Sequence, residues 1–216
     1  MSAVFAPKER VLGVLGGASV PTSLLASWAD SATFIAAADG GADALLAAGL
    51  TPRLVVGDLD SLQADRALFP DVREDPSEAF TDCDKLLSVL ASQGFGAVTL
   101  INITGDLPDH ELAIFHSAAK SGLACRLVFA RGFGHVLVGP YQGRFSGEAR
   151  VSLLPLSACS GVWLRGVRWP LERANLDALG ATSISNHAVG APIEVELESG
   201  AAFLFLESEP EPDWPE

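Results

Sequence analysis

Two aspartates stand one residue apart at the end of an apolar run, in the stretch "LVVGDLDS" at residues 54–61. Side chains one residue apart on a strand point to opposite faces, so Asp58 and Asp60 converge only if the chain turns, which Gly57 permits. Converging carboxylates repel one another unless a cation lies between them. Hard oxygen ligands suit Mg²⁺, so the stretch predicts a magnesium site that substrate phosphates complete.

Two further aspartates occupy comparable positions. Asp39 ends the run "FIAAAD", and Asp82 lies at the start of a predicted helix. In an open α/β sheet, ligands bind beyond the carboxyl ends of the strands, which makes such positions functional candidates. Any one of these aspartates is equally well explained as a helix cap or a turn residue. Four together favour a metal site.

Short apolar runs alternate with helical stretches in the first two-thirds of the chain. Continuous apolar runs are typical of parallel strands that are buried on both faces. The predicted strands cover residues 11–15, 34–38, 54–56, 98–103 and 127–130. The alternation predicts a doubly wound α/β domain, with a mostly parallel sheet and helices on both faces.

Two predicted helices carry candidate site residues. The first, over residues 81–91, opens with Thr81 and Asp84 at capping-box spacing. Its predicted apolar face consists of Leu86, Leu87 and Leu90. The second is predicted to be capped by Asp109. Its predicted apolar face consists of Leu112, Phe115 and Ala119.

After about Gly139 helical periodicity disappears, and short β-type runs are separated by Gly, Pro, Ser and Asn. This change predicts an α/β domain over residues 1–139 and a β-sandwich over 140–208. The pair Ser199-Gly200 suits a tight hairpin between the last two runs. Residues 209–216 are acidic and Pro-rich, and are predicted to form a frayed tail.

The composition narrows the class of protein. The chain has 216 residues, is 49% hydrophobic and carries a net charge of −13, from 27 acidic and 14 basic residues. Such acidity disfavours nucleic acid or an anionic membrane as a partner. The cysteines, Cys83, Cys125 and Cys159, lack CxxC spacing, so we expect neither disulfides nor zinc. No signal peptide or membrane-spanning run is visible, and a cytoplasmic location is expected.

Three known motifs bear on how phosphates could bind and on the role of the aspartates. No GxxxxGK[ST] is present, and "GVLGGAS" after the first strand is not GxGxxG, so phosphates need another cradle. An apolar strand followed by Asp58-Leu59-Asp60 resembles the nucleophile motif of haloacid-dehalogenase-like phosphatases. That motif expects Thr or Val where Leu62 stands, and it gives Asp39 no role.

Read together, "AADGGADALLAAGLTPRLVVGDLDSL", "TDCDKLL" and "DHELA" closely resemble the catalytic domain of the thiamine pyrophosphokinase family. The later "GVWLRGVRWPL" and "SISNHAVG" resemble its β-domain, and the match spans about residues 11–206. The resemblance implies an α/β domain plus a β-sandwich, and a homodimer. It also implies transfer of pyrophosphate from ATP to the thiamine hydroxyl, which releases AMP.

The resemblance also implies roles for individual residues. Mg²⁺ is expected on Asp58, Asp60 and Asp82, with Asp39 nearby. Lys85 is expected to contact a phosphate, and Asp109 to accept the hydroxyl proton or orient a substrate. His110 is either a nucleotide contact or a structural histidine. Ser185 and Asn186 are expected to help form the thiamine pocket.

The chain departs from the family pattern in two places. Where the family has Gly-x-Arg-x-Asp-His, this chain has Leu107 in place of the arginine, so a phosphate contact is expected to be lost unless Arg131 replaces it. The Gln-Asp-Ser that commonly precedes TDxxK is Glu78-Ala79-Phe80 here. Two alternatives therefore stay open: a pyrophosphokinase of the same fold for another hydroxymethyl heterocycle such as a pterin, and a non-catalytic homologue that binds thiamine or nucleotide.

Overall fold

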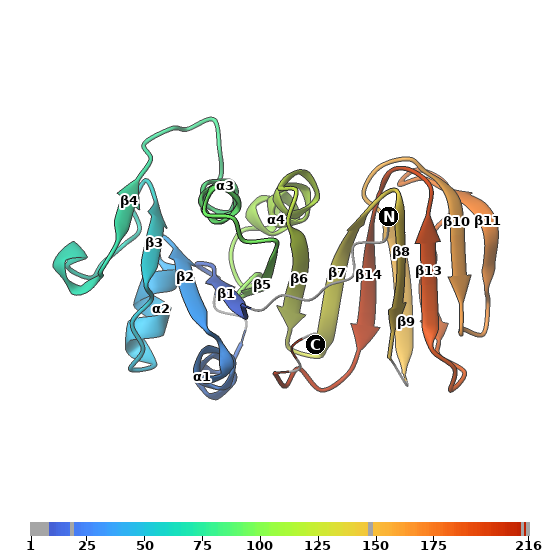
Figure 1. Ribbon diagram of the computed structural model, residues 1–216, viewed down its shortest axis with the longest axis horizontal. Coiled ribbons are helices and arrows are strands. Elements are labelled where there is room, and N and C mark those ends of the chain that lie inside the picture. Colours follow the sequence, from blue (N-terminus) through green and yellow to red (C-terminus); the bar gives the residue numbers. More distant parts are fainter. Residues whose placement is uncertain (1–8, 18–19, 147–148, 213, 215–216) are drawn as a thin grey trace. The chain divides into compact units, whose positions relative to one another are not determined.

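The computed structural model describes residues 9–17, 20–146, 149–212 and 214 (Figure 1). The described chain forms two compact units. One runs to Ala130 and includes the segment from Pro210, and the other runs from Arg131 to Glu209. The division lies before the predicted boundary at residue 139, because β7 (Gly132–Val138) pairs antiparallel with β14 (Ala201–Glu207) and so belongs to the second unit.

The first unit contains a parallel sheet with the strand order β4-β3-β2-β1-β5-β6. Its strands are β1 (Val11–Val14), β2 (Phe34–Ala38), β3 (Leu54–Gly57), β4 (Val72–Glu74), β5 (Ala97–Ile101) and β6 (Ala124–Phe129). Every residue of β1 and β3 is buried, as expected of strands that are covered on both faces. The short strand β4 was not predicted, because its three residues, two of them charged, carry no apolar run.

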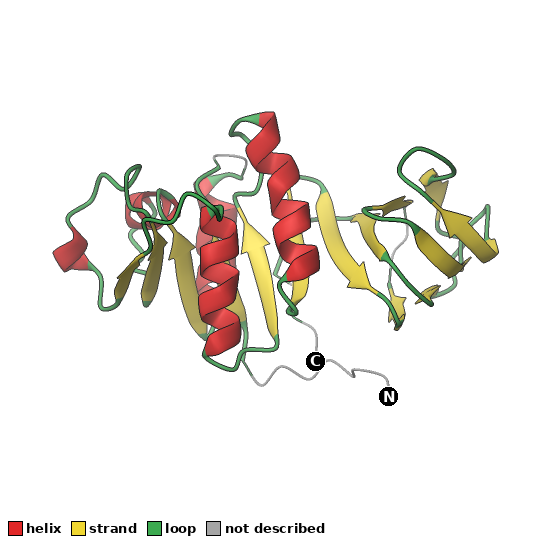
Figure 2. Ribbon diagram, turned by 90° about the horizontal axis from the view of Figure 1, so that it is seen from above, coloured by secondary structure: helices red, strands yellow, loops and turns green. Residues whose placement is uncertain are grey.

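Helices cover both faces of this sheet (Figures 1 and 2). They are α1 (Thr22–Ser31), α2 (Gly41–Ala47), α3 (Asp82–Ser92) and α4 (Pro108–Lys120), with a short 3-10 turn at Arg66–Leu68. The chain builds outward from β1 to β4 with α1 and α2 on one face. It then returns to β5 and β6 with α3 and α4 on the other, as right-handed crossovers require. The predicted doubly wound fold is confirmed, and its direction reverses between β1 and β5.

The start of α3 follows the predicted capping chemistry. The amide of Asp84 donates to Thr81 Oγ1 at 3.1 Å, and the amide of Thr81 donates to Asp84 Oδ2 at 3.2 Å, which completes the capping box. The three leucines of the predicted apolar face, Leu86, Leu87 and Leu90, are buried. The local signals of this helix therefore agree with its tertiary packing.

The prediction for α4 was wrong in two details. The N-cap is Leu107, and Pro108 occupies the first helical position, so Asp109 lies inside the first turn rather than capping it. The buried face is formed by Ile114, Ser117 and Ala118, whereas Leu112 is 63% exposed. Spacing alone could not choose between these faces, because apolar residues lie on both.

The C-terminal segment is anchored, at least over its described residues, which contradicts the predicted frayed tail. The indole N–H of Trp28 in α1 donates to the carbonyl of Pro210 at 2.8 Å, and that of Trp214 donates to Ser31 Oγ at 2.8 Å. The rings of Trp28 and Trp214 pack edge to face with centroids 5.1 Å apart. Trp214 thus supplies a packing contact although the rest of this segment is acidic and Pro-rich.

The second unit is a β-sandwich of two antiparallel sheets, as predicted. The remaining strands are β8 (Tyr141–Phe145), β9 (Arg150–Pro155), β10 (Cys159–Arg165), β11 (Leu171–Leu176), β12 (Ser183–His187) and β13 (Ile193–Leu197). Within this unit the strands of one sheet have the order β12-β9-β14-β7, and those of the other have the order β11-β10-β13-β8. Alternate residues of β13 and β14, including Val195 and Leu204, point into a shared core.

The expected hairpin at Ser199-Gly200 is not formed. β13 pairs with β10 and β8, whereas β14 pairs with β7 and β9, so the short connection carries the chain from one sheet to the other. Gly200 has a φ of 94°, and a Cβ there would lie 2.3 Å from the carbonyl of Ala158. The glycine is required by this crossing rather than by a hairpin turn.

None of the helices in the described part of the chain has the length and apolar character needed to cross a membrane.

Candidate active site

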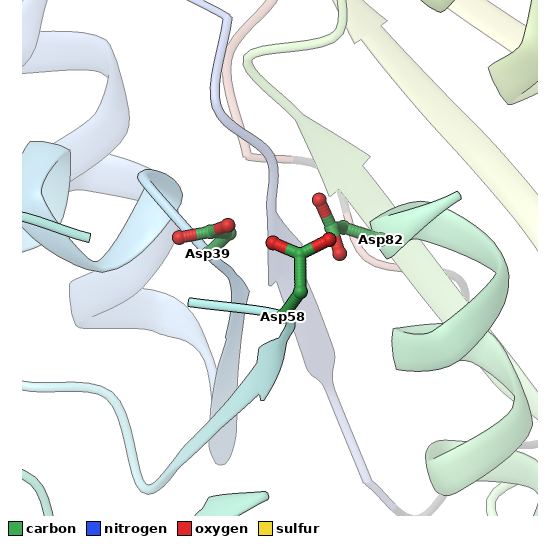
Figure 3. Close-up of side chains that lie close together, drawn as sticks. All are labelled: Asp39, Asp58 and Asp82. Atoms are coloured by element: carbon green, nitrogen blue, oxygen red, sulfur yellow. The ribbon is translucent and has the colours of Figure 1, made fainter. Parts of the chain in front are cut away.

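Three carboxylates converge at the carboxyl edge of the parallel sheet (Figure 3). Asp39 follows β2, Asp58 follows β3, and Asp82 begins α3. Each offers an oxygen that lies within 4.8 Å of the others'. The alternation of strands and helices positions them, because parallel strands bring their carboxyl ends to one edge and α3 enters at the same edge.

The backbone at this edge is held in unusual conformations. Asp39 and Leu59 have φ values of 43° and 66°, a region that residues with a Cβ rarely adopt. The amide of Asp39 donates to the carbonyl of Val56 at 3.0 Å and so joins the ends of β2 and β3. A Cβ on Gly57 would lie 3.0 Å from that of Asp39 and 3.2 Å from Asp82 Oδ1. Gly57 therefore permits close approach, and the left-handed residue is Leu59.

Asp60 lies outside the group of three. Its side chain is exposed, and its amide donates to Asp58 Oδ1 at 3.3 Å, which helps to orient Asp58. The structure thus brings Asp58 and Asp82 together as the sequence suggested, but with Asp39 as the third neighbour.

Lys85 is buried between the aspartates instead of lying on the helix surface. Its side chain is 2% exposed, and Nζ donates to Asp58 Oδ2 at 3.1 Å and to Asp82 Oδ1 at 3.0 Å. Burial works to lower the pKa of Lys85, but the hydrogen bonds that it donates to both carboxylates outweigh this effect and raise that pKa. The hydrogen bond from Lys85 in turn lowers the pKa of Asp58.

Asp39 is the unsatisfied member of the group. The residue is 3% exposed, and neither of its carboxylate oxygens has a hydrogen-bond partner in the described part of the chain. Burial raises its pKa. The nearby Ser61 opposes the rise without reaching hydrogen-bond geometry, and the charge of Asp82 adds to it. A buried carboxylate without a partner is costly, and a bound cation would remove that cost, so the donor set fits Mg²⁺.

Asp109 and His110 lie on the exposed first turn of α4. His110 Nδ1 lies 2.8 Å from Asp106 Oδ2, and this hydrogen bond raises the pKa of His110 and lowers that of Asp106. The amide of Gly105 donates to Glu111 Oε1 at 2.7 Å and closes the loop onto the helix. The charges of Asp109 and Asp82 add to the rise in the pKa of His110.

The two departures from the family pattern are both exposed. Leu107 presents an apolar side chain to solvent at the start of α4. Residues 78–80 are exposed as well, immediately before α3. Arg131, which we considered as a substitute cation, belongs to the second unit and forms an ion pair with Glu207 there.

In the second unit, Ser185 and Asn186 lie on β12 but differ in environment. Ser185 has a φ of 61° at a bulge in the pairing of β12 with β9, and its side chain is exposed. Asn186 is buried. Its side-chain oxygen accepts from the amide of Trp169 at 3.0 Å, and its side-chain nitrogen donates to the carbonyl of Trp169 at 2.6 Å. The side chain of Asn186 therefore fixes the backbone of Trp169.

Trp169 is a candidate site residue that the sequence reasoning did not assign to the thiamine pocket. Its side chain is 54% exposed although its backbone is held on both sides, and the guanidinium of Arg168 lies 5.0 Å from the ring centroid. The ring of His187 lies 6.1 Å away. A tryptophan directly before Pro170, between two β-type runs, was the available signal, because such a ring is hard to bury in a short connection.

Both family models that match the chain describe domains of the same family. Residues 25–128 match the model described as the catalytic domain of thiamin pyrophosphokinase, and residues 143–202 match its vitamin B1 binding domain. The carboxylate group and Lys85 lie within the first match. Ser185, Asn186 and Trp169 lie within the second. No curated protein sequence matches the chain.

Solved structures share the fold at low identity. A thiamine pyrophosphokinase from Bacillus subtilis is similar over 93% of this chain and 99% of its own, with 21% identity and a TM-score of 0.75. A thiamin pyrophosphokinase from Candida albicans is similar over 96% of each chain, with 15% identity and a TM-score of 0.74. The yeast enzyme is similar over 94% of this chain and 87% of its own, with 13% identity and a TM-score of 0.72.

Proposed function

The chain belongs to the thiamin pyrophosphokinase family, and on that premise we propose that it transfers pyrophosphate from ATP to the hydroxyl group of thiamine. Family membership implies thiamine diphosphokinase activity. In the reaction the thiamine oxygen bonds to the β-phosphorus, the bond from that phosphorus to the α,β-bridging oxygen breaks, and AMP leaves. The retained carboxylate group of Asp39, Asp58 and Asp82, with Lys85 buried inside it, is the observation that supports an enzyme rather than a binding protein.

We assign Mg²⁺ to Asp58 and Asp82, with Asp39 and Asp60 on either side. Bound there, the ion would neutralise charge on phosphate oxygens. Asp39 supports the assignment, since its buried oxygens have no partner among the described residues. Asp60 is exposed beside Asp58 and is free to complete the set from the solvent side.

Lys85 supplies a fixed positive charge to the same site. It is held by two carboxylates, so it loses little conformational freedom when a phosphate approaches. We assign proton acceptance from the thiamine hydroxyl, or orientation of that hydroxyl, to Asp109. We assign a nucleotide contact to His110, whose ring is oriented by Asp106.

We place thiamine against Ser185 and Trp169. Thiamine is a cationic heteroaromatic molecule, and an exposed indole ring attracts such a ligand. Asn186 contributes by holding Trp169 in place. The three cysteines are free and buried, which agrees with a reducing compartment, and we retain the cytoplasm as the proposed location.

Ser185→Ala is expected to raise the KM for thiamine about three- to tenfold with a smaller change in kcat, because one ground-state hydrogen bond is lost. Serine and alanine both carry a Cβ, so the strain at a φ of 61° is the same in both proteins. Steady-state kinetics with saturating ATP measures the effect. A defect confined to kcat would remove Ser185 from the thiamine pocket.

Leu107→Arg is expected to raise kcat/KM for ATP about tenfold, since a charge-assisted contact to phosphate adds roughly 1.5–3 kcal/mol when it forms in the transition state. Leu107 is exposed, so the longer side chain meets no steric obstacle. Leu107→Gln is the matched control, because it adds length and polarity without charge. Unchanged or lower kcat/KM in Leu107→Arg would mean that another cation already supplies the contact.

We also propose a homodimer formed through the second unit. Val138, Ile184 and Val189 are large apolar side chains of that unit that are about half exposed, and a partner subunit that covered them would remove apolar surface from water. Sedimentation velocity at micromolar concentration is expected to give a mass of about twice 22.5 kDa. A fully active monomer would contradict the assignment.

The acceptor substrate is tested by product analysis. Purified protein is incubated with Mg²⁺ and ATP, together with either thiamine or a hydroxymethylpterin, and AMP is quantified. AMP formed only with thiamine supports the proposal. AMP formed only with the pterin would favour the same-fold alternative, and binding of thiamine without AMP would favour the non-catalytic one.

A further inference from the structure

The reversal point of the parallel sheet lies between β1 and β5 and contains features that the phosphate site does not use. After β1, the amide of Leu15 donates to the carbonyl of Ile101 at 3.0 Å, and the amide of Gly17 donates to the carbonyl of Asn102 at 3.0 Å. The segments that follow β1 and β5 therefore run side by side past the ends of these strands. In a doubly wound sheet this is the place where the crevice for a ligand forms.

Asn102, the residue directly after β5, combines burial, a side-chain oxygen without a hydrogen-bond partner among the described residues, and a left-handed backbone. It is only 4% exposed, and its side-chain oxygen has no hydrogen-bond partner in the part of the chain that the structure describes. Its φ is 60°, a conformation that is unfavourable for any residue with a Cβ, although asparagine tolerates it better than most. A buried acceptor without a donor and a left-handed backbone both cost stability, and such costs persist where a ligand uses the group.

The chemistry of this acceptor selects the part of the ligand that can reach it. An amide oxygen accepts hydrogen bonds and cannot donate one. The phosphate oxygens of ATP are acceptors as well at neutral pH, so they have no proton to offer to Asn102. The ribose hydroxyls and the amino group of adenine are donors. Asn102 therefore suits the nucleoside, and the carboxylate group suits the metal-bound phosphates.

We infer that Asn102 is a nucleoside-binding residue, whose side-chain oxygen accepts a hydrogen bond from the ribose or the adenine of ATP at the end of β5. This inference deepens the proposed function and rests on ATP being the pyrophosphate donor. The glycines after β1 complete the subsite. A Cβ on Gly17 would lie 2.3 Å from the carbonyl oxygen of Thr104, so only glycine fits at this position. A Cβ on Gly16, in contrast, would meet nothing within 4 Å. The space above Gly16 is open for the ligand.

The test uses Asn102→Gly, which removes the side chain and keeps a residue that adopts a positive φ without strain. Because the buried orphan oxygen is gone, the variant is expected to unfold at a temperature equal to or above that of the wild type. Its affinities for AMP and for ATP, measured by calorimetry without thiamine, are expected to fall by the same factor of about five to ten. Its affinity for inorganic tripolyphosphate with Mg²⁺ is expected to stay unchanged.

A second pair of variants tests the open space at Gly16, the neighbour of the glycine whose amide donates to the carbonyl of Asn102. Gly16→Ala is expected to weaken AMP binding at least about fivefold, because a methyl group would enter the space assigned to the nucleoside. Gly96→Ala is the matched control. Gly96 is exposed as well, an added Cβ there would also meet nothing within 4 Å, and it precedes β5 at the opposite end of the strand. This control is expected to bind AMP as the wild type does.

The possible outcomes separate the inference from the proposed function. If Asn102→Gly and Gly16→Ala bind AMP and ATP as tightly as the wild type, the inference is overturned even where thiamine turnover is normal. Equal weakening of tripolyphosphate would also overturn it, because the residue would then act on the phosphates. Weaker binding of thiamine with unchanged AMP would assign the acceptor to the other substrate and overturn it as well. If the wild type forms no thiamine diphosphate, the proposed function fails, and AMP binding still tests the inference.

Discussion

Asp58→Asn is expected to lower kcat at least about a hundredfold while leaving the fold intact. The substitution keeps the size of the side chain but removes a charge that faces Lys85 and Asp82 at the carboxyl edge of the sheet. The side chain is 37% exposed and fills no core volume, so the unfolding midpoint is expected to change little. Turnover of thiamine and circular dichroism on the same preparation measure the two effects.

Asp30→Asn is the matched control for this prediction. It makes the same chemical change on the exposed surface of α1, and it is expected to leave kcat within about a factor of two. Asp60→Asn is expected to lower kcat by orders of magnitude as well, if Asp60 is a metal ligand. Normal activity of Asp58→Asn would contradict the metal assignment. Normal activity of Asp60→Asn alone would leave Asp39, Asp58 and Asp82 as the ligand set.

Lys85→Met is expected to lower kcat at least about tenfold and to reduce the free energy of unfolding by about 1–3 kcal/mol in the absence of metal. Methionine fills the buried space of the lysine stem, so the loss reports the missing charge. Without that charge, the carboxylates of Asp39, Asp58 and Asp82 repel one another. We expect less than the full cost of breaking a buried ion pair, because Asp58 and Asp82 are about one-third exposed and are screened by solvent.

Magnesium distinguishes this explanation from a simple packing defect. A divalent cation between the carboxylates would remove the repulsion, so Mg²⁺ is expected to raise the unfolding midpoint of Lys85→Met more than that of the wild type. Urea unfolding with and without Mg²⁺ measures the difference. Lys120→Met serves as the control, because Lys120 pairs with Asp84, which lies outside the carboxylate group, so its effect on unfolding is expected not to depend on Mg²⁺. Equal Mg²⁺ responses in wild type and Lys85→Met would refute the repulsion.

The sequence predicted that aspartates meet at the carboxyl edge of the parallel sheet, but not which three of them form the group. Parallel topology brings the ends of β2 and β3 together whatever their side chains are, so Asp39 and Asp58 were predictable neighbours. Which aspartate completes the group depends on the backbone after Gly57, where the turn falls at Leu59 and leaves Asp60 facing solvent. A left-handed leucine gives no signal in a sequence, because the surrounding structure imposes it.

The burial of Lys85 was also beyond local reasoning. On α3 it follows Asp82 by one turn and reads as a solvent-facing residue, whereas Asp58, from another strand, supplies the second carboxylate that makes its burial possible. The same holds for Trp214, whose partner Trp28 lies far away in the chain. In both cases the deciding contact is tertiary, so neither helix periodicity nor composition contains it.

The position of Asn186 shows a limit of reasoning from resemblance. Both residues of the Ser-Asn pair lie on β12, but they have different environments in the structure. The side chain of Asn186 is hydrogen-bonded to the backbone of Trp169 and is buried, whereas that of Ser185 faces solvent. Adjacent residues of a strand point to opposite faces, so a two-residue motif can contain one residue for the ligand and one for the fold.

The most direct measurement of the central claim follows the γ-phosphorus of ATP into the product. The purified protein is incubated with Mg²⁺, thiamine and ATP labelled at the γ-phosphorus, and the products are separated. Pyrophosphate transfer predicts labelled thiamine diphosphate and unlabelled AMP in equal amounts, and Asp58→Asn should form neither at a comparable rate. Labelled thiamine monophosphate with ADP, or label found only in inorganic phosphate, would contradict the account.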